Sequence, residues 1–228
     1  MDGSACLCLF IKSPESRRIK TRLAADVGTD KARAIYTAMV LDLLTNIREC
    51  AIPLHYYLNS PEGISSFFEP AGIDQSAIYL QRGETIGERM SNCFREEFAR
   101  GYEKVVLIGS DIPAIDASLI QTSFQHLEHH ETVIGPAADG GYYLIGFHKD
   151  TFHPGCFSDI PWSTSRVYRE TIDRFKKQNL SWYAGPVLQD IDDLGGLQNV
   201  VYNASLVYRL PHLMAATSDL KSDASGQS

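Results

Sequence analysis

The chain of 228 residues is long enough for one sizeable α/β domain and too short for two comfortable ones. Its hydrophobic fraction of 44% and charged fraction of 21% are those of a globular protein and exclude a fibrous or disordered chain. A net charge of −7 argues against a nucleic-acid partner, because that binding needs a basic face. We expect a single domain over residues 1–214 and a disordered, polar tail over residues 215–228.

The cysteines and the amino-terminal residues indicate the compartment. The five cysteines include no CxxC pair, so neither a disulfide framework nor a zinc ribbon is expected. Cys6 and Cys8 alternate with apolar residues, and we interpret them as small core residues of a strand. The chain start lacks the pattern of a signal peptide, and no apolar run reaches about 18 residues. We therefore expect a cytoplasmic protein that does not enter a membrane.

The first expected strand covers residues 5–11, and a cluster of cations follows it. Five cations lie within eleven residues of an otherwise acidic chain: Lys12, Arg17, Arg18, Lys20 and Arg22. Arginine gives bidentate contacts to phosphate and lysine gives a point charge, so the cluster suits a phosphate or diphosphate. The alternative is a solvated basic loop. We favour the ligand because a parallel sheet would bring this loop to the same edge as Asp111. Neither a Walker loop nor a GxGxxG motif is present.

The following segments alternate between helix and strand. Apolar residues spaced four apart predict a helix over residues 30–49. Strands are expected at residues 54–58 and 78–80, with a short helix at 61–69 between them. Another helix carries Ile86 and ends at Gly101. Arg89 in its first turns is either a surface charge or a cleft residue, and its position alone favours the surface.

The central strand is an unbroken apolar run over residues 105–108, which indicates burial on both faces of a sheet. Ser110 and Asp111 follow at once. Ligands of open α/β sheets collect outside the carboxyl ends of the strands, so Asp111 stands where chemistry is expected. The alternative is that Asp111 only shapes the turn into Pro113, and position does not separate the two interpretations.

A helix over residues 117–130 and a hairpin come next. The helix ends in three histidines: His126, His129 and His130. Without a third ligand at metal spacing, a solvated helix end is favoured over a metal site. The sequence Asp139-Gly140-Gly141 between two apolar runs predicts a turn that joins residues 132–135 to 142–147. Beside Asp111, this turn would also let the backbone approach a ligand closely.

The last third of the chain holds a second group of carboxylates. Ser163 is expected to cap a helix, and Trp162 is either an acceptor platform or a buried anchor. After a strand at 180–184, three further carboxylates suit a helix start or a hard divalent cation: Asp190, Asp192 and Asp193. In an extended segment Asp190 and Asp192 would share one face and so could meet one ion. A last helix over 200–210 is expected to stop at Pro211.

The alternation of strands and helices predicts a three-layer α/β/α domain with a mostly parallel sheet. Six ordered sequence blocks then resemble the DUF2064 family of glycosyltransferase-A-like (GT-A-like) proteins, some of them linked to arsenosugar biosynthesis. The blocks are residues 10–14 with 20–23, 87–90, 109–113, 135–146, 161–164 and 190–192. The resemblance runs from about Phe10 to Leu197, which is nearly the whole expected domain.

The resemblance implies a nucleotide-diphospho-sugar transferase fold and a set of site residues. In that fold a carboxylate at the end of the central strand binds the Mg²⁺ or Mn²⁺ that bridges the nucleotide phosphates, and Asp111 matches it. Asp190 or Asp192 would be the second metal ligand. The expected catalytic residues are Asp111, Lys20 and Asp139. The expected nucleotide or phosphate contacts are Lys12, Arg17, Lys20, Arg22, Arg89 and Ser110. The donor or acceptor pocket would be lined by Asp139, Gly140, Gly141, Tyr142 and Trp162.

Two departures from the family pattern bear on the reaction and on the choice between Asp190 and Asp192 as the metal ligand. Arg17 stands where the family usually has a glycine, and Asp193-Leu194-Gly195 replaces a Thr-Pro-Glu-like continuation. Nucleotidyltransferases rely on a glycine-rich first loop, so its absence favours glycosyl transfer from a nucleotide sugar to a small-molecule acceptor. The alternatives are nucleotidyl transfer from a nucleoside triphosphate, with release of pyrophosphate, and a nucleotide-binding protein without turnover.

Overall fold

The computed structural model describes residues 4–16, 19–62, 64–68 and 71–220. Its centre is a seven-stranded sheet in the order β3-β2-β1-β4-β6-β5-β7. The strands are β1 (Ala5–Ile11), β2 (Leu54–Leu58), β3 (Ile78–Leu80), β4 (Lys104–Gly109), β5 (Thr132–Pro136), β6 (Tyr142–His148) and β7 (Trp182–Ala184). β6 is antiparallel to β4 and β5, and the other strand pairs are parallel, which confirms the predicted sheet.

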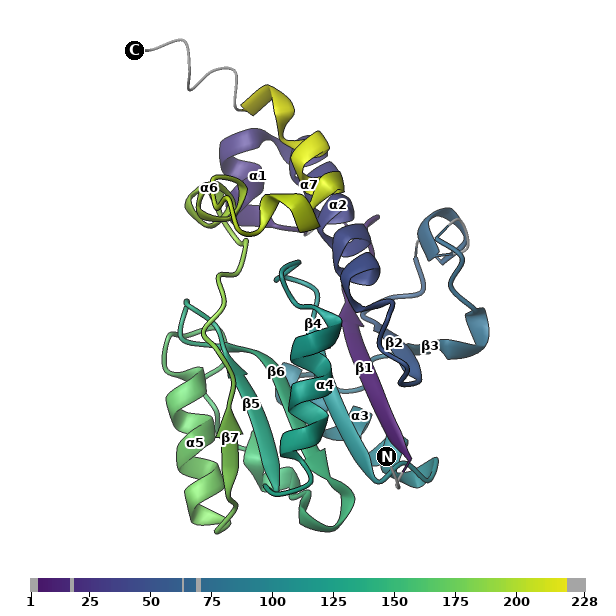
Figure 1. Cartoon of the computed structure of the whole chain (residues 1–228), viewed down its shortest axis with the longest axis vertical. Helices are drawn as coiled ribbons and strands as arrows, with labels where there is room; N and C mark the ends of the chain where they lie inside the picture. Colours follow the sequence, from purple (N-terminus) through teal and green to yellow (C-terminus); the bar gives the residue numbers. More distant parts are fainter. Residues whose placement is uncertain (1–3, 17–18, 63, 69–70, 221–228) are drawn as a thin grey trace.

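Helices cover both faces of this sheet and also gather beyond one of its ends. They are α1 (Thr21–Val27), α2 (Thr29–Ile47), α3 (Ile86–Ala99), α4 (Ala117–His126), α5 (Val167–Lys177), α6 (Leu194–Val201) and α7 (Pro211–Ala216). Figure 1 shows α1, α6 and α7 together at the top, above the ends toward which β1 runs. The short helix expected after β2 is a π-helix at Ile64–Phe68. Among the described residues, none of the helices has the length and apolar character to span a membrane.

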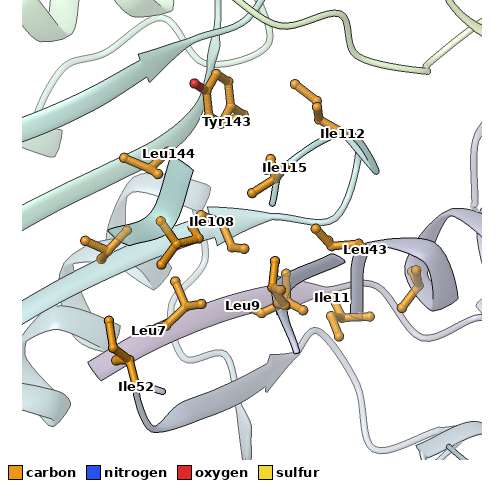
Figure 2. Packing of buried hydrophobic residues seen from close by; sticks show 14 of the residues in the cluster. Leu7, Leu9, Ile11, Leu43, Ile52, Ile108, Ile112, Ile115, Tyr143 and Leu144 are labelled. Carbon is orange, nitrogen blue, oxygen red and sulfur yellow. The ribbon is translucent and has the colours of Figure 1, made fainter. Parts of the chain in front are cut away.

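The alternation of side chains along β1 divides the core between the two faces of the sheet. Leu7, Leu9 and Ile11 pack into one cluster, whereas Cys6, Cys8 and Phe10 belong to the cluster on the opposite face. Figure 2 shows the first cluster, where β1 meets Leu43 of α2 and Ile108 of β4. Each fully buried aliphatic side chain contributes roughly 1.5–3 kcal/mol, so the two faces fix the orientation of β1 firmly.

The prediction of a last helix over residues 200–210 was wrong. The structure ends α6 at Val201 and begins α7 at Pro211, where the missing proline N–H costs nothing because first-turn N–H groups have no helical partner. The next N–H groups, of His212 and Leu213, donate to the buried carboxylate of Asp42 at 3.0 and 2.8 Å. Asp42 therefore caps α7 from α2.

Residues 215–220, expected to be disordered, are ordered. The end of α7 and a further helical turn contain them. Thr217 is buried, its hydroxyl donates to the Leu213 carbonyl at 2.8 Å, and Lys31 forms an ion pair with Asp219. The remaining expected tail, residues 221–228, lies outside the described residues.

Ser163 does not cap a helix, contrary to the prediction. α5 begins at Val167 with Arg166 at its N-cap, and Ser163 has a φ of 62°, in the left-handed region. The preceding residues form a tight turn in which the Thr164 hydroxyl donates to the Pro161 carbonyl at 2.7 Å. This turn delays the start of the helix.

Candidate active site

A cavity of about 710 Å³ opens at the carboxyl ends of β1 and β4. The predicted site residues that line it are Lys12, Lys20, Arg22, Arg89, Ser110, Asp111, Asp139, Gly141, Tyr142, Trp162, Asp190 and Asp192. Gly140 is not among its lining residues, and Arg17 lies outside the described residues. β1 and β4 are parallel neighbours, so their carboxyl ends lie at the same edge of the sheet. The loop of cations that begins at Lys12 follows β1 and Asp111 follows β4, and the two are therefore close together.

An ion pair between Lys20 and Asp111 forms part of the cavity wall. Lys20 Nζ lies 2.5 Å from Asp111 Oδ1, and the lysine side chain is only 1% exposed. Lys20 has a φ of 46°, a left-handed conformation that costs a non-glycine residue about 1–3 kcal/mol. Burial acts to raise the pKa of Asp111, but the charges of Lys20 and Lys12 outweigh it and hold the pKa below its ordinary value. Asp111 is therefore ionised at neutral pH.

Two further aspartates face this pair from the segment after β7. Asp192 Oδ1 lies 3.7 Å from Lys20 Nζ, and its Oδ2 lies 3.4 Å from Arg22 Nη1. Ile191 is fully buried and its N–H donates to the Asp111 carbonyl at 3.1 Å, so the segment is fixed to the end of β4. Asp190 and Asp192 both line the cavity, as the alternation of an extended segment predicts.

The carboxylates on this side of the cavity repel one another. Burial and the negative charge of Asp139 raise the pKa of Asp190, and the charge of Asp192 acts in the same direction. Lys20 acts in the opposite direction but does not cancel the shift. The site thus combines a carboxylate that is easily ionised, Asp111, with one that resists ionisation, Asp190.

The donor chemistry of the cavity fits a hard divalent cation. Mg²⁺ and Mn²⁺ prefer carboxylate oxygens, and Asp111, Asp190 and Asp192 supply them on one wall. Within the described ranges, these carboxylates do not form a group of three with oxygens less than 4.8 Å apart. Mg²⁺ commonly takes one or two carboxylates and completes its shell with water and substrate phosphates, so the open arrangement suits it.

The predicted hairpin turn is confirmed and it anchors α5. Gly140 has a φ of 88°, and a Cβ there would lie 2.2 Å from the Ser165 carbonyl oxygen. Its own carbonyl accepts from the Tyr168 N–H at 2.9 Å, and Asp139 Oδ1 accepts from the Gly141 N–H at 2.7 Å. Gly140 therefore holds the turn against α5, which places the exposed Asp139 at the rim of the cavity.

Trp162 both packs against α3 and lines the cavity. A Cβ on Gly87 would lie 2.7 Å from the indole, so the ring rests directly on the first turn of α3. Tyr142 meets the ring edge-on, with ring centroids 6.5 Å apart.

Arg89 also lines the cavity, although its position in sequence favoured the surface. Its Nε donates to the Gly83 carbonyl at 3.0 Å.

Ser110, just after β4, is linked through Tyr36 to Lys12, just after β1. Its buried hydroxyl lies 2.8 Å from the hydroxyl of Tyr36, which also accepts from the Lys12 N–H at 3.0 Å. Burial and the neighbouring charge of Asp111 raise the pKa of Tyr36, so this phenol stays neutral. A neutral Tyr36 thus supports the start of the cation loop.

Asn59 and Gln81 also line the cavity, and neither was expected. Asn59 Oδ1 accepts from the Ser13 N–H at 2.7 Å, and Gln81 Nε2 donates to the Tyr57 carbonyl at 2.9 Å. Both follow their strands directly, as Asp111 nearly does after β4. The rule that singled out Asp111 therefore also applied to the ends of β2 and β3.

The histidines at the end of α4 make contacts away from the cavity. His126 stacks on Tyr183 with ring centroids 3.4 Å apart, and His130 Nδ1 lies 3.0 Å from the His126 carbonyl. Burial and the neighbouring His130 lower the pKa of His126. This lowered pKa favours a neutral imidazole, which suits the stacking against Tyr183.

Comparisons with known proteins identify a family and similar solved structures. The family model described as "uncharacterized protein conserved in bacteria (DUF2064)" matches residues 54–164. A crystal structure from Desulfovibrio desulfuricans G20, entitled a "putative nucleotide-diphospho-sugar transferase", is 35% identical with a TM-score of 0.85, covering 95% of this chain and 96% of that one. No curated protein matches the sequence.

More distant solved structures share the fold alone. A cytidylyltransferase from Leptospira borgpetersenii has a TM-score of 0.55 at 11% identity, covering 96% of both chains. Glucosyl-3-phosphoglycerate synthase from Mycobacterium tuberculosis, solved with Mg²⁺ and UDP, has a TM-score of 0.50 at 14% identity, covering 92% of this chain and 80% of that one. The GT-A-like fold implied by the sequence blocks is confirmed.

Proposed function

This chain belongs to the DUF2064 family and has the nucleotide-diphospho-sugar transferase fold, and we propose that it transfers a glycosyl group from a nucleotide sugar to a small-molecule acceptor. The observation that carries the proposal is the ion pair of Lys20 and Asp111 inside the cavity. The two carboxylates offset the cost of burying this amine, and such clusters of charged groups in a cleft are common at functional sites. The cavity of about 710 Å³ is within the usual range for small-molecule sites, roughly 300–1,000 Å³.

The cations would hold the diphosphate of the donor. Lys20 and Arg22 are paired with carboxylates, and the phosphate oxygens of a donor would offer them further anionic partners. A transfer of the Lys20 amine from Asp111 to phosphate would free Asp111 Oδ1. Lys12, whose charge already acts on Asp111, would add a further contact from the loop.

The carboxylates would hold a divalent cation next to the diphosphate. Asp111, with Asp190 or Asp192, supplies the oxygen donors, and Mg²⁺ or Mn²⁺ bound there would neutralise charge that develops on the leaving diphosphate. A single electrostatic contact of this kind typically lowers a barrier by about 2.7–4 kcal/mol. Asp139 at the rim would accept a hydrogen bond from the attacking hydroxyl of the acceptor, and Trp162 would pack against the sugar or the acceptor.

Nucleotidyl transfer from a nucleoside triphosphate is the alternative. It is supported by the four cations that line one cavity and together suit a triphosphate: Lys12, Lys20, Arg22 and Arg89. A third alternative, a nucleotide-binding protein without turnover, requires binding that does not depend on Asp111 or on metal. The three proposals differ in the ligand that binds and in the product that is released.

A thermal-shift panel separates these alternatives. Nucleotide sugars and nucleoside triphosphates are added with and without Mn²⁺ to the wild type, to Asp111→Asn and to a control, Asp150→Asn. Asp150 has a side chain that is 84% exposed and does not line the cavity. A ligand at about 100 times its Kd adds about 2.7 kcal/mol, which raises Tm by a few degrees.

We expect metal-dependent stabilisation by a nucleotide sugar in the wild type and in Asp150→Asn, and none in Asp111→Asn. Turnover of the donor so identified should fall by about 10²–10³-fold in folded Asp111→Asn. A shift with triphosphates alone, together with release of pyrophosphate, would replace glycosyl transfer by nucleotidyl transfer. Binding that is unchanged in Asp111→Asn and without metal would contradict both forms of transfer.

A further inference from the structure

A second group of metal-ligating side chains lies apart from the cavity. Cys6 and Cys8 point to the same face of β1, and Glu97 approaches them from α3. One ligand atom from each of these three residues lies within 4.8 Å of the others, and all three residues are buried. None of them lines the cavity that contains Asp111. The cluster therefore needs an explanation of its own.

His55 brings a fourth donor to this cluster. It stands opposite Cys8 in the pairing of β1 with β2, and its Nδ1 lies 3.0 Å from Glu97 Oε2. Its side chain is 13% exposed, whereas that of Glu97 is fully buried. The rings of Tyr79 and Tyr102 flank it at 5.1 and 5.6 Å. The imidazole thus connects the buried donors to the surface.

We propose that Cys6, Cys8, Glu97 and His55 bind a thiophilic divalent cation, with Zn²⁺ as the best fit. Two sulfurs, one carboxylate oxygen and one imidazole nitrogen are a donor set that Zn²⁺ accepts in tetrahedral sites. A tetrahedral ion with Zn–S bonds of about 2.3 Å keeps two sulfurs roughly 3.8 Å apart. The donor atoms of Cys6, Cys8 and Glu97 lie within 4.8 Å of one another, so the two sulfurs need to close by only about 1 Å, and His55 reaches the group through Glu97.

The charges around the cluster suit a bound dication. Two thiolates and a carboxylate carry three negative charges, and a buried site must balance them. The cation supplies two positive charges, and the Arg100 guanidinium, whose Nη1 lies 3.0 Å from Glu97 Oε1, supplies the third. His55 must give up its proton to bind the cation, and with the imidazole bound in its neutral form this set of groups is electrically neutral.

A supporting shell already orients the carboxylate. The Tyr57 hydroxyl donates to Glu97 Oε1 at 2.6 Å, and Arg100 lies over the ring of Tyr79. Hydrogen bonds from such outer groups fix metal ligands in place and raise metal affinity. A bound cation would join β1, β2 and α3, and it would stabilise the sheet without taking part in the reaction at Asp111.

Co²⁺ tests the site in the full-length, metal-free protein. Tetrahedral Co²⁺ bound by thiolates gives a sulfur-to-metal charge-transfer absorption and intense visible bands, whereas carboxylate sites give weak octahedral spectra. We expect one equivalent of Co²⁺ to give the thiolate spectrum, and one equivalent of Zn²⁺ to remove it. A wild-type spectrum without the charge-transfer band would overturn the proposal, and this measurement requires no variant to fold.

Matched variants assign the ligands. Cys8→Ser and His55→Asn should each weaken binding of Zn²⁺ by at least about tenfold, and Cys8→Ser should also diminish the charge-transfer band. Cys50→Ser is the control, because Cys50 is a partly buried thiol outside the cluster. Asp111→Asn should keep the full Co²⁺ spectrum. Loss of the spectrum in Asp111→Asn or in Cys50→Ser, or its full retention in Cys8→Ser, would contradict the assignment.

Discussion

Lys20 shows how one residue joins backbone conformation to electrostatics. Its left-handed backbone and its buried amine are both unfavourable, and they persist because Asp111 and Asp192 surround the amine. Such strain is common at functional sites, where the surrounding structure over-determines a conformation. The same residue leads directly into α1, so the conformation that aims the amine also sets the start of that helix.

Asp190 carries a prediction about stability. Its pKa is raised in the fold by burial and by Asp139, so its protonated form is favoured there. That stabilising contribution is fully present below the unfolded pKa of about 3.9 and is lost as the pH rises through the raised folded pKa. At pH 7, well above the unfolded pKa, Asp190 therefore destabilises the metal-free protein.

Asp190→Asn should raise Tm at pH 7 in the presence of a chelator, with a gain of about 0.5–2 kcal/mol, as is common when a charge conflict is relieved. The gain should shrink below about pH 4, because the wild-type carboxyl is then protonated. Excess Mn²⁺ should stabilise the wild type more than the variant. A variant less stable than the wild type in chelator at pH 7 would show that Asp190 is not in conflict with its neighbours.

At the scale of elements, the β5–β6 hairpin sets the rim of the cavity. Its turn contacts the residues just before α5, and the Gly140 carbonyl accepts from the first turn of that helix. A hairpin turn thus also acts as a docking point between sheet and helix. The position of Asp139 depends on this contact.

Gly140→Ala tests the docking. A Cβ would meet the Ser165 carbonyl oxygen at 2.2 Å in addition to the strain of a positive φ, which alone costs about 1–3 kcal/mol. Gly72→Ala is the matched control, because Gly72 also has a positive φ but no atom within 4 Å of its added Cβ. Urea denaturation should give a loss in Gly140→Ala that exceeds the control by about 1 kcal/mol or more. Equal losses would mean that strain alone matters.

At the scale of the whole molecule, three hydrophobic clusters share their elements. β1 contributes to the clusters on both faces of the sheet, and α2 contributes to one of these and to the cluster of α1, α6 and α7. Asp42 of α2 also caps α7. These shared elements couple the helices at the top of Figure 1 to the sheet below them.

We therefore expect the chain to unfold in one cooperative step. Far-UV circular dichroism reports all the helices, whereas tryptophan fluorescence reports Trp162 at the cavity and Trp182 in β7. In urea the two signals should give the same midpoint within error, as in a two-state transition. Separate midpoints would indicate that the helices beyond the strand ends unfold independently of the sheet.

The sheet, most helices and the residues that line the candidate site could be predicted from the sequence. Apolar runs and alternation depend on local periods, so β1, β2, β3 and the hairpin were found at or near their observed bounds. Asp111 was identified because ligands of open α/β sheets bind outside the carboxyl ends of the strands. The family resemblance then grouped it with Lys20, Asp190 and Asp192. The predicted cap at Ser163 failed because a local turn delays the start of α5, and the predicted stop at Pro211 failed because Asp42 of α2 caps a new helix there.

Contacts between side chains from distant elements could not be predicted from the sequence. The burial of Lys20 against Asp111 and the approach of Glu97 to the thiols of β1 depend on strands and helices distant in sequence. The physical reason is that periodicity specifies which face of an element is buried, whereas distances between ligand atoms depend on the packing of all elements together.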